Sequence, residues 1–184
     1  MLRILDLGAG TGTAKVIYDA QAQKEIVTVD LNPDLNPDVL CDVRELPDSI
    51  GMFDVIYASH ILEHLGIREA APTLKHWREH LKPGGMLCVI VPDLNWLANK
   101  IFMEEGNYAL YMAVLYGNAE TDLQTHKSSY TIELLRRIVV DAGYVVQEAS
   151  LSPFQIGLTS AEGTEAVTAM QIVLMAHRPK ENEA

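Results

Sequence analysis

The chain has 184 residues, of which 48% are hydrophobic, and its formal net charge is -11 at pH 7. This length and composition predict a single compact domain over residues 1–184. The negative charge repels polyanions, so it argues against nucleic acid as a partner and favours a small molecule. No apolar stretch is long enough to span a membrane, and we expect neither a signal peptide nor an anchor. Cys41 and Cys88 lie in apolar runs, which predicts free thiols and a cytoplasmic location.

Short runs rich in β-branched residues alternate with helical periodicity along most of the chain. The first five predicted strands are residues 3–7, 25–30, 39–42, 53–59 and 86–91. This alternation predicts an α/β fold of the Rossmann-like, doubly wound kind, with helices on both faces of a mostly parallel sheet. With two further strands near the C-terminus, we expect about seven strands.

The pattern changes after the fifth predicted strand, which ends at Pro92. Two amphipathic stretches, residues 94–105 and 108–116, predict a helical insertion at about 93–126 that forms a lid or one wall of a pocket. Asp93 is a candidate N-cap for the first of these helices.

Regular alternation then returns with a predicted helix over residues 132–143, where Gly143 is the expected C-cap. Two strands follow, over residues 144–150 and 170–178. The segment between them shows no helix of crossover length, so we predict an antiparallel hairpin with a long loop and an antiparallel last strand. Residues 179–184 are predicted to be a disordered tail.

A glycine-rich turn, LDLGAGTGT over residues 5–13, is the clearest functional motif. Its glycines permit positive φ and close approach of a ligand, and the turn is expected to lead into a helix near Thr13. Ligands of open α/β sheets bind beyond the carboxyl ends of the strands, next to such a turn. Thr13 stands where a dinucleotide fingerprint has its third glycine or alanine, which weakens the alternative of an NAD-binding oxidoreductase.

Three acidic residues accompany this turn. Asp30 ends the second predicted strand, about 20 residues on, where a carboxylate accepts hydrogen bonds from ribose hydroxyls. Asp42 ends the third predicted strand at the same edge and can accept from an adenine amino group. Asp6, beneath the turn, could hold the loop or face a ligand ammonium group through water. A cap or turn role remains the alternative for each.

Several segments, in order, resemble class I S-adenosylmethionine-dependent methyltransferases, specifically the small members related to methyltransferase type 11. They are LDLGAGTGT, VTVDLNP, LCDVRELP, FDVIYASHILEHL, LKPGGMLCVIVPD, HKSSYT and IELLRRIVVDAGY. The resemblance covers nearly the whole chain. It implies methyl transfer from S-adenosylmethionine to an oxygen or nitrogen of a small-molecule acceptor, such as a sugar or a lipid-linked metabolite. A non-catalytic partner that binds the cofactor and regulates another enzyme is the alternative.

The resemblance also implies a set of site residues. Glycines of the turn would line the methionine end of the cofactor, Asp30 would hold the ribose, Asp42 and Val43 would contact the adenine, and Ser59 would lie near the sulfonium. The full cofactor-binding set is Asp6, Gly8, Ala9, Gly10, Thr11, Gly12, Asp30, Leu31, Asp42, Val43 and Ser59. Family members usually carry helices before the glycine-rich strand. Here the insertion or a second subunit, as in a homodimer, is expected to supply that cover.

Two histidines after the fourth predicted strand form the pattern HxxEH, with His60 and His64 one turn apart on a predicted helix and Glu63 between them. This pattern matches the inverted zinc-peptidase motif. It recurs at residues 76–80, and no further ligand has the right context, so we expect no metal site. His60, close to where acceptor and methyl group would meet, and His126, after the insertion, are the candidate general bases. A structural role is the alternative for both.

Overall fold

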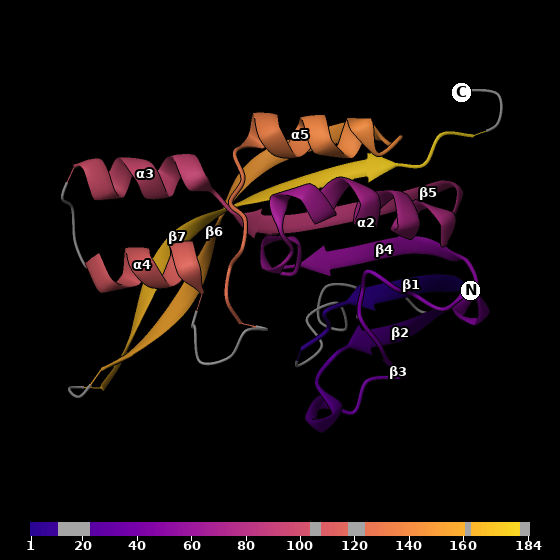
Figure 1. Cartoon of the computed structure of the whole chain (residues 1–184), viewed down its shortest axis with the longest axis horizontal. Helices are drawn as coiled ribbons and strands as arrows, with labels where there is room; N and C mark the ends of the chain where they lie inside the picture. The colour runs from indigo at the N-terminus through magenta and orange to yellow at the C-terminus, as the bar shows by residue number, and fades with distance from the viewer. Residues whose placement is uncertain (11–22, 104–107, 118–123, 161–162, 181–184) are drawn as a thin grey trace.

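The computed structural model describes residues 1–10, 23–103, 108–117, 124–160 and 163–180. Its strands form a seven-stranded sheet in the order β3-β2-β1-β4-β5-β7-β6 (Figure 1). The strands are β1 (Leu2–Leu7), β2 (Lys24–Asp30), β3 (Val39–Leu40), β4 (Phe53–Ser59), β5 (Leu81–Pro92), β6 (Val145–Ser160) and β7 (Gly163–His177). Neighbouring strands from β3 to β5 are parallel, and β7 is antiparallel to both β5 and β6. The predicted Rossmann-like sheet with an antiparallel last strand is confirmed.

The main core lies between one face of this sheet and two helices, α2 (Ile67–Glu79) and α5 (Ile132–Asp141). Alternate strand residues such as Leu5, Ile56 and Val89 point to this face and are fully buried. They meet the apolar side of α2, where Leu74 and Trp77 are also fully buried. Burying side chains of this size contributes about 1.5–3 kcal/mol each, so this layer holds the strand ends in place.

The other face of the sheet carries a smaller apolar cluster. Ile4, Val55, Tyr57, Cys88 and Ile90 are its buried members, and they come from the three central strands β1, β4 and β5. The helix expected near Thr13 lies outside the described residues. Among the described residues, α2 and α5 cover the face of the sheet that forms the main core. Period-two alternation along each strand explains why both faces are apolar.

The insertion folds as two helices, α3 (Leu94–Phe102) and α4 (Tyr108–Tyr116). Asp93 caps α3 as predicted, because its carboxylate accepts hydrogen bonds from the backbone of Asn95 and Trp96. The two helices pack on each other through a separate cluster of Leu97, Leu110, Tyr111 and Val114. In Figure 1 they lie beyond the carboxyl end of β5, beside the projecting β6–β7 hairpin.

Two local predictions are wrong. The predicted long loop between the last strands is replaced by a continuous ladder, in which β6 and β7 pair as far as Ser160 and Gly163. The fifth strand was predicted to begin at Met86, but β5 begins at Leu81 and includes the pair Gly84–Gly85. The pairing register with β4 shifts across this segment, so the glycines occupy an irregularity within the strand.

Within the described residues, no helix combines the length and hydropathy needed to cross a membrane. Cys41 and Cys88 are both free thiols, as predicted.

Candidate functional site

The glycine turn after β1 is held tightly against the neighbouring chain. Gly8 and Gly10 have φ values of 62° and 50°, which L-residues with a side chain adopt at a cost. Between them the backbone N–H of Ala9 donates to the Val29 carbonyl at 3.1 Å. A Cβ added to Gly8 would lie 2.5 Å from Cδ1 of Ile61, so this glycine is also needed for space. Thr11 and Gly12 lie outside the described residues.

Asp30 at the end of β2 turns its carboxylate toward this loop. Its Oδ2 accepts from the Gly10 N–H at 3.0 Å, and its Oδ1 accepts from the Asn32 N–H at 2.9 Å. An ionised carboxylate offers about four acceptor positions, so further positions are left for hydroxyl donors of a ligand. Leu31 is 43% exposed directly after Asp30 and leaves an apolar surface beside the carboxylate.

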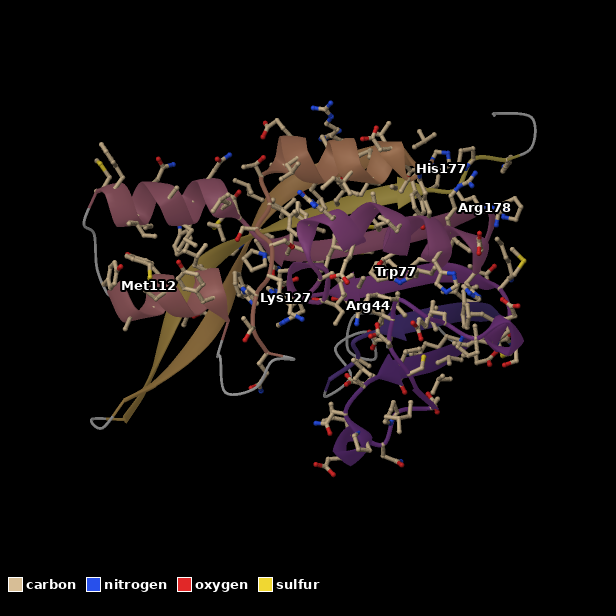
Figure 2. The ribbon with its side chains drawn as sticks, viewed as in Figure 1. Arg44, Trp77, Met112, Lys127, His177 and Arg178 are labelled. Atoms are coloured by element: carbon tan, nitrogen blue, oxygen red, sulfur yellow. The ribbon has the colours of Figure 1, made fainter. Side chains whose placement is uncertain are left out.

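Asp42 lies at the same edge, two residues after β3, and is paired with Arg44. The Arg44 guanidinium contacts both Asp42 oxygens, at 3.0 Å from Nε and 2.6 Å from Nη2, and these hydrogen bonds lower the pKa of Asp42. Arg44 also bridges to Glu69 on α2 at 2.6 Å. The carbonyl of Val43 accepts from the buried Trp77 indole at 2.8 Å, which anchors this loop below α2 (Figure 2). A ligand group at Asp42 would therefore share the carboxylate with Arg44.

Asp6 and Ser59 lie on the two central strands under the turn. Asp6 is 2% exposed and is paired in register with Tyr57 of β4. Ser59 is half-buried at the carboxyl end of β4 and hydrogen bonds to Tyr57, whose pKa burial raises. The structure thus brings the described members of the predicted cofactor set to one edge of the sheet.

The segment after β4 differs from the predicted helix. His60 has a φ of 53°, and only Leu62–His64 forms a short 3-10 helix, η3. The reversal at His60 ends β4 sharply and lets the ring turn back onto Glu63. His60 Nδ1 lies 3.1 Å from Glu63 Oε1, and its Nε2 lies 3.0 Å from Gln171 Oε1 on β7. Burial lowers the pKa of His60, but the hydrogen bond and charge of Glu63 outweigh it and the pKa is raised.

His126 reaches the same place from the insertion. The N–H groups of Lys127 and Ser128 donate to the Glu63 carbonyl at 2.8 and 3.1 Å, which fixes this loop on η3. His126 Nδ1 lies 2.9 Å from the Val114 carbonyl oxygen of α4. The His126 ring packs edge-on against the His64 ring, with 4.8 Å between the ring centroids. Burial lowers the pKa of His126, which favours its neutral form.

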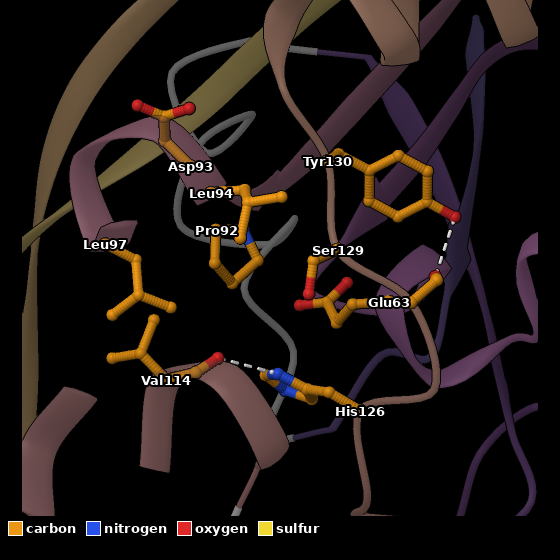
Figure 3. A pocket seen from close by; sticks show the side chains of 10 residues that line it. Glu63, Pro92, Asp93, Leu94, Leu97, Val114, His126, Ser129 and Tyr130 are labelled. Atoms are coloured by element: carbon orange, nitrogen blue, oxygen red, sulfur yellow. Dashed lines mark hydrogen bonds between the residues drawn. The ribbon is translucent and has the colours of Figure 1, made fainter. Parts of the chain in front are cut away.

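A pocket opens between η3, the end of β5 and the two insertion helices. Figure 3 shows Glu63, Ser129 and His126 around it, with the Asp93 carboxylate directed away from them. Pro92, Leu97 and Val114 supply apolar wall, and Tyr130 supplies a buried phenol whose pKa burial raises to about 12. Leu94, Leu97 and Val114 of the two insertion helices thus line this pocket.

Sequence reasoning missed two residues in and around this pocket. Glu63 was named only as part of HxxEH, although its near-complete burial makes it central. Gln171 gave no signal, because a polar residue in a predicted strand normally faces solvent. Tyr130 belongs to the segment HKSSYT, which was expected to return toward this edge, and it does line the pocket, where its hydroxyl donates to the Leu62 carbonyl at 3.3 Å.

Known proteins supply an independent comparison. Residues 2–149 match a family model described as a methyltransferase domain. A comparison with curated protein sequences finds no match.

Among solved structures, an S-adenosylmethionine-dependent methyltransferase from Methanosarcina mazei is 17% identical to this chain. The TM-score is 0.66, and the match covers 98% of this chain and 93% of that one. The 1,6-didemethyltoxoflavin-N1-methyltransferase of Burkholderia thailandensis, with bound 1,6-didemethyltoxoflavin and S-adenosylhomocysteine, is 16% identical; the TM-score is 0.60, and the match covers 97% of this chain and 72% of that one. TehB from Haemophilus influenzae is 13% identical, with a TM-score of 0.63 covering 96% and 57%. The chain belongs to the methyltransferase domain family and has the fold of class I S-adenosylmethionine-dependent methyltransferases.

Proposed function

We propose that this protein transfers the methyl group of S-adenosylmethionine to an oxygen or nitrogen atom of a small-molecule acceptor. The observation that carries the proposal is the Asp30 carboxylate, which hydrogen bonds to the glycine turn at the carboxyl edge of the sheet. A carboxylate and a glycine turn in contact at this edge form a binding site for an adenosyl ligand. The match to a methyltransferase domain identifies the chemistry that such a ligand would serve.

The donor would lie across β1, β2 and β4. Asp30 would accept from the ribose hydroxyls, while exposed Leu31 would cover one face of the adenosine. Asp42 and Val43 remain the proposed adenine contacts, and Arg44 keeps the Asp42 carboxylate ionised for that role. The proposal also keeps Asp6, Ser59 and the turn, including Thr11 and Gly12, around the methionine portion.

The acceptor would occupy the pocket beside η3. It lies at the carboxyl end of β5, next to β4, whose end at Ser59 is proposed to approach the sulfonium. Its walls combine apolar side chains with the polar groups of Glu63 and His126, which suits a small molecule with both kinds of surface. The net charge of -11 argues against a nucleic acid acceptor.

Positioning would supply most of the rate. The acceptor lone pair attacks the methyl carbon opposite sulfur, and the C–S bond breaks with its electron pair remaining on sulfur. If the acceptor is a hydroxyl, its proton must leave, and neutral His126 is the better of the two candidate bases. Both ring nitrogens of His60 already face oxygen atoms, so His60 acts as a positioning residue that orients Glu63.

The test uses methyl-labelled S-adenosylmethionine and pools of small hydroxylated and amine compounds. We expect protein-dependent transfer of label into at least one pool, and a turnover at least about tenfold lower for His126→Ala, at unchanged affinity for S-adenosylhomocysteine. Binding of S-adenosylhomocysteine with no transfer into any pool would instead identify a non-catalytic cofactor-binding partner. Binding of NAD in its place would identify an oxidoreductase.

A further inference from the structure

Glu63 is a deeply buried carboxylate beside the pocket. It is 1% exposed, and its Oε1 faces His60. Its Oε2 is buried and has no hydrogen-bond partner among the described residues. Leaving a carboxylate oxygen buried without a partner costs free energy, so such an atom needs an explanation such as a bound ion.

Two histidines present ligand atoms to the same space. One ligand atom from each of Glu63, His64 and His126 lies within 4.8 Å of the other two. The Nδ1 atoms of His64 and His126 face the carbonyls of Thr125 and Val114 at 3.3 and 2.9 Å. Each Nδ1 must therefore carry the proton, which leaves the lone pair on Nε2.

This arrangement is the usual support of a metal-binding histidine. Imidazole ligands typically donate the second ring N–H to a backbone carbonyl, which fixes both the tautomer and the ring orientation. Here the Lys127 and Ser128 N–H groups also hold the His126 loop on the carbonyl of Glu63. The three side chains are thus held close together before any ion binds.

We propose that Glu63, His64 and His126 bind one divalent transition-metal ion, with Zn²⁺ as the best fit to two imidazoles and a carboxylate. Ligand atoms about 2.0–2.2 Å from zinc lie about 3.4 Å apart, so small side-chain rotations that draw the atoms together complete the site. Three protein ligands leave a fourth position open, as in catalytic zinc sites. The sequence alone predicted no metal site. The proposed site also differs from a peptidase site, because HxxEH lies on a 3-10 turn and the third ligand comes from the insertion.

The open position has a specific use that rests on the proposed function. Glu63 and His126 line the acceptor pocket, so an acceptor oxygen can reach an ion held between them. The ion would then bind and polarise an acceptor hydroxyl, which loses its proton to solvent, and His126 would act as a ligand instead of a base. Acceptors with a hydroxyl or carboxylate beside the methylated atom are the predicted class.

Metal binding can be measured without donor or acceptor. Metal-free, tag-free full-length protein is titrated with Zn²⁺ by calorimetry and with Co²⁺ by visible absorption. We expect one equivalent of either ion, with a cobalt spectrum typical of a low-coordinate site, and no comparable binding of Mg²⁺. Glu63→Gln, His64→Gln and His126→Gln should each weaken Zn²⁺ binding by at least about 100-fold.

The chain provides its own control in the second HxxEH pattern on α2. His76 Nδ1 lies 3.6 Å from Glu79 Oε2 there, so His76→Gln removes a histidine of the repeated pattern outside the proposed site and should leave the Zn²⁺ affinity unchanged. Circular dichroism checks the fold of each variant, and the two histidine variants decide the matter if Glu63→Gln does not fold. A wild-type protein that binds no Zn²⁺, or variants that bind like His76→Gln, would overturn the proposal. Titration of the same samples with S-adenosylhomocysteine separates this failure from failure of the proposed function.

Discussion

Replacement of Gly8 by alanine tests how the glycine turn is built. A side chain at this position meets two separate obstacles, a backbone φ of 62° and the side chain of Ile61. Gly10 provides the matched control, because its φ is 50° but, among the described residues, the nearest atom to an added Cβ is 4.0 Å away. The pair of variants therefore separates backbone strain from steric overlap.

The magnitudes follow from these distances. Left-handed backbone costs an alanine about 1–2 kcal/mol, and this is the whole expected loss for Gly10→Ala. In Gly8→Ala the new Cβ would lie 2.5, 2.8 and 3.1 Å from three successive carbons of Ile61, against a normal contact near 3.5–4.0 Å. Rotation of the terminal methyl alone does not relieve all three contacts. Overpacking of this kind adds about 1–3 kcal/mol, so the expected total is about 2–5 kcal/mol.

Equilibrium urea unfolding measures these losses. The double variant Gly8→Ala/Ile61→Ala completes a thermodynamic cycle with the two single variants. We expect a favourable coupling of about 1–3 kcal/mol, because truncation of Ile61 makes room for the new Cβ. Equal losses for Gly8→Ala and Gly10→Ala, together with a coupling near zero, would refute the steric part of the reasoning.

Three further predictions concern the framework. Burial raises the pKa of Cys88 to about 12, so a thiol reagent should modify it in the native protein at pH 8 far more slowly than in urea, as followed by mass spectrometry. A hydrogen bond from Lys82 lowers the pKa of the Asp54 carboxyl below its ordinary value of 3.8. The ion pair therefore stabilises the folded state by about 0.5–1 kcal/mol above pH 3.8, and this stabilisation is lost as the pH falls below that value. Urea unfolding should show Asp54→Asn less stable than wild type at pH 7, with the difference shrinking toward pH 2. Trp77→Phe leaves the Val43 carbonyl without its indole donor and should cost about 1–3 kcal/mol in the same assay.

The parallel half of the sheet and its glycine turn could be predicted because local pattern and tertiary structure agree there. Each central strand is a short apolar run, and Gly8, Gly10 and Asp30 stand at the strand ends where the fold needs them. The β6–β7 hairpin could not be predicted to its full length. The segment between the two predicted strands contains Pro153, Gly157 and Gly163, residue types that are depleted in strands, so its sequence favoured a loop.

The histidine cluster shows a different limit of sequence reasoning. A spacing of four residues between His60 and His64 fits an α-helix, but the same residues can also lie in a short 3-10 turn, as observed. Sequence periodicity alone could not distinguish these two local structures. The convergence of Glu63 with His126 depends on backbone hydrogen bonds between segments more than 60 residues apart. Such contacts depend on the whole fold and leave no local pattern.

The central claim is that Asp30 and the glycine turn together bind an adenosyl ligand. Calorimetric titration of the purified full-length protein with S-adenosylhomocysteine tests it most directly, with Asp30→Ala and, as a control, the exposed neighbour Asp34→Ala. We predict one equivalent bound, an affinity at least about tenfold weaker in Asp30→Ala, which corresponds to about 1.4 kcal/mol, and no change in Asp34→Ala. No binding of S-adenosylhomocysteine or S-adenosylmethionine, or an equal effect of the two substitutions, would contradict the account.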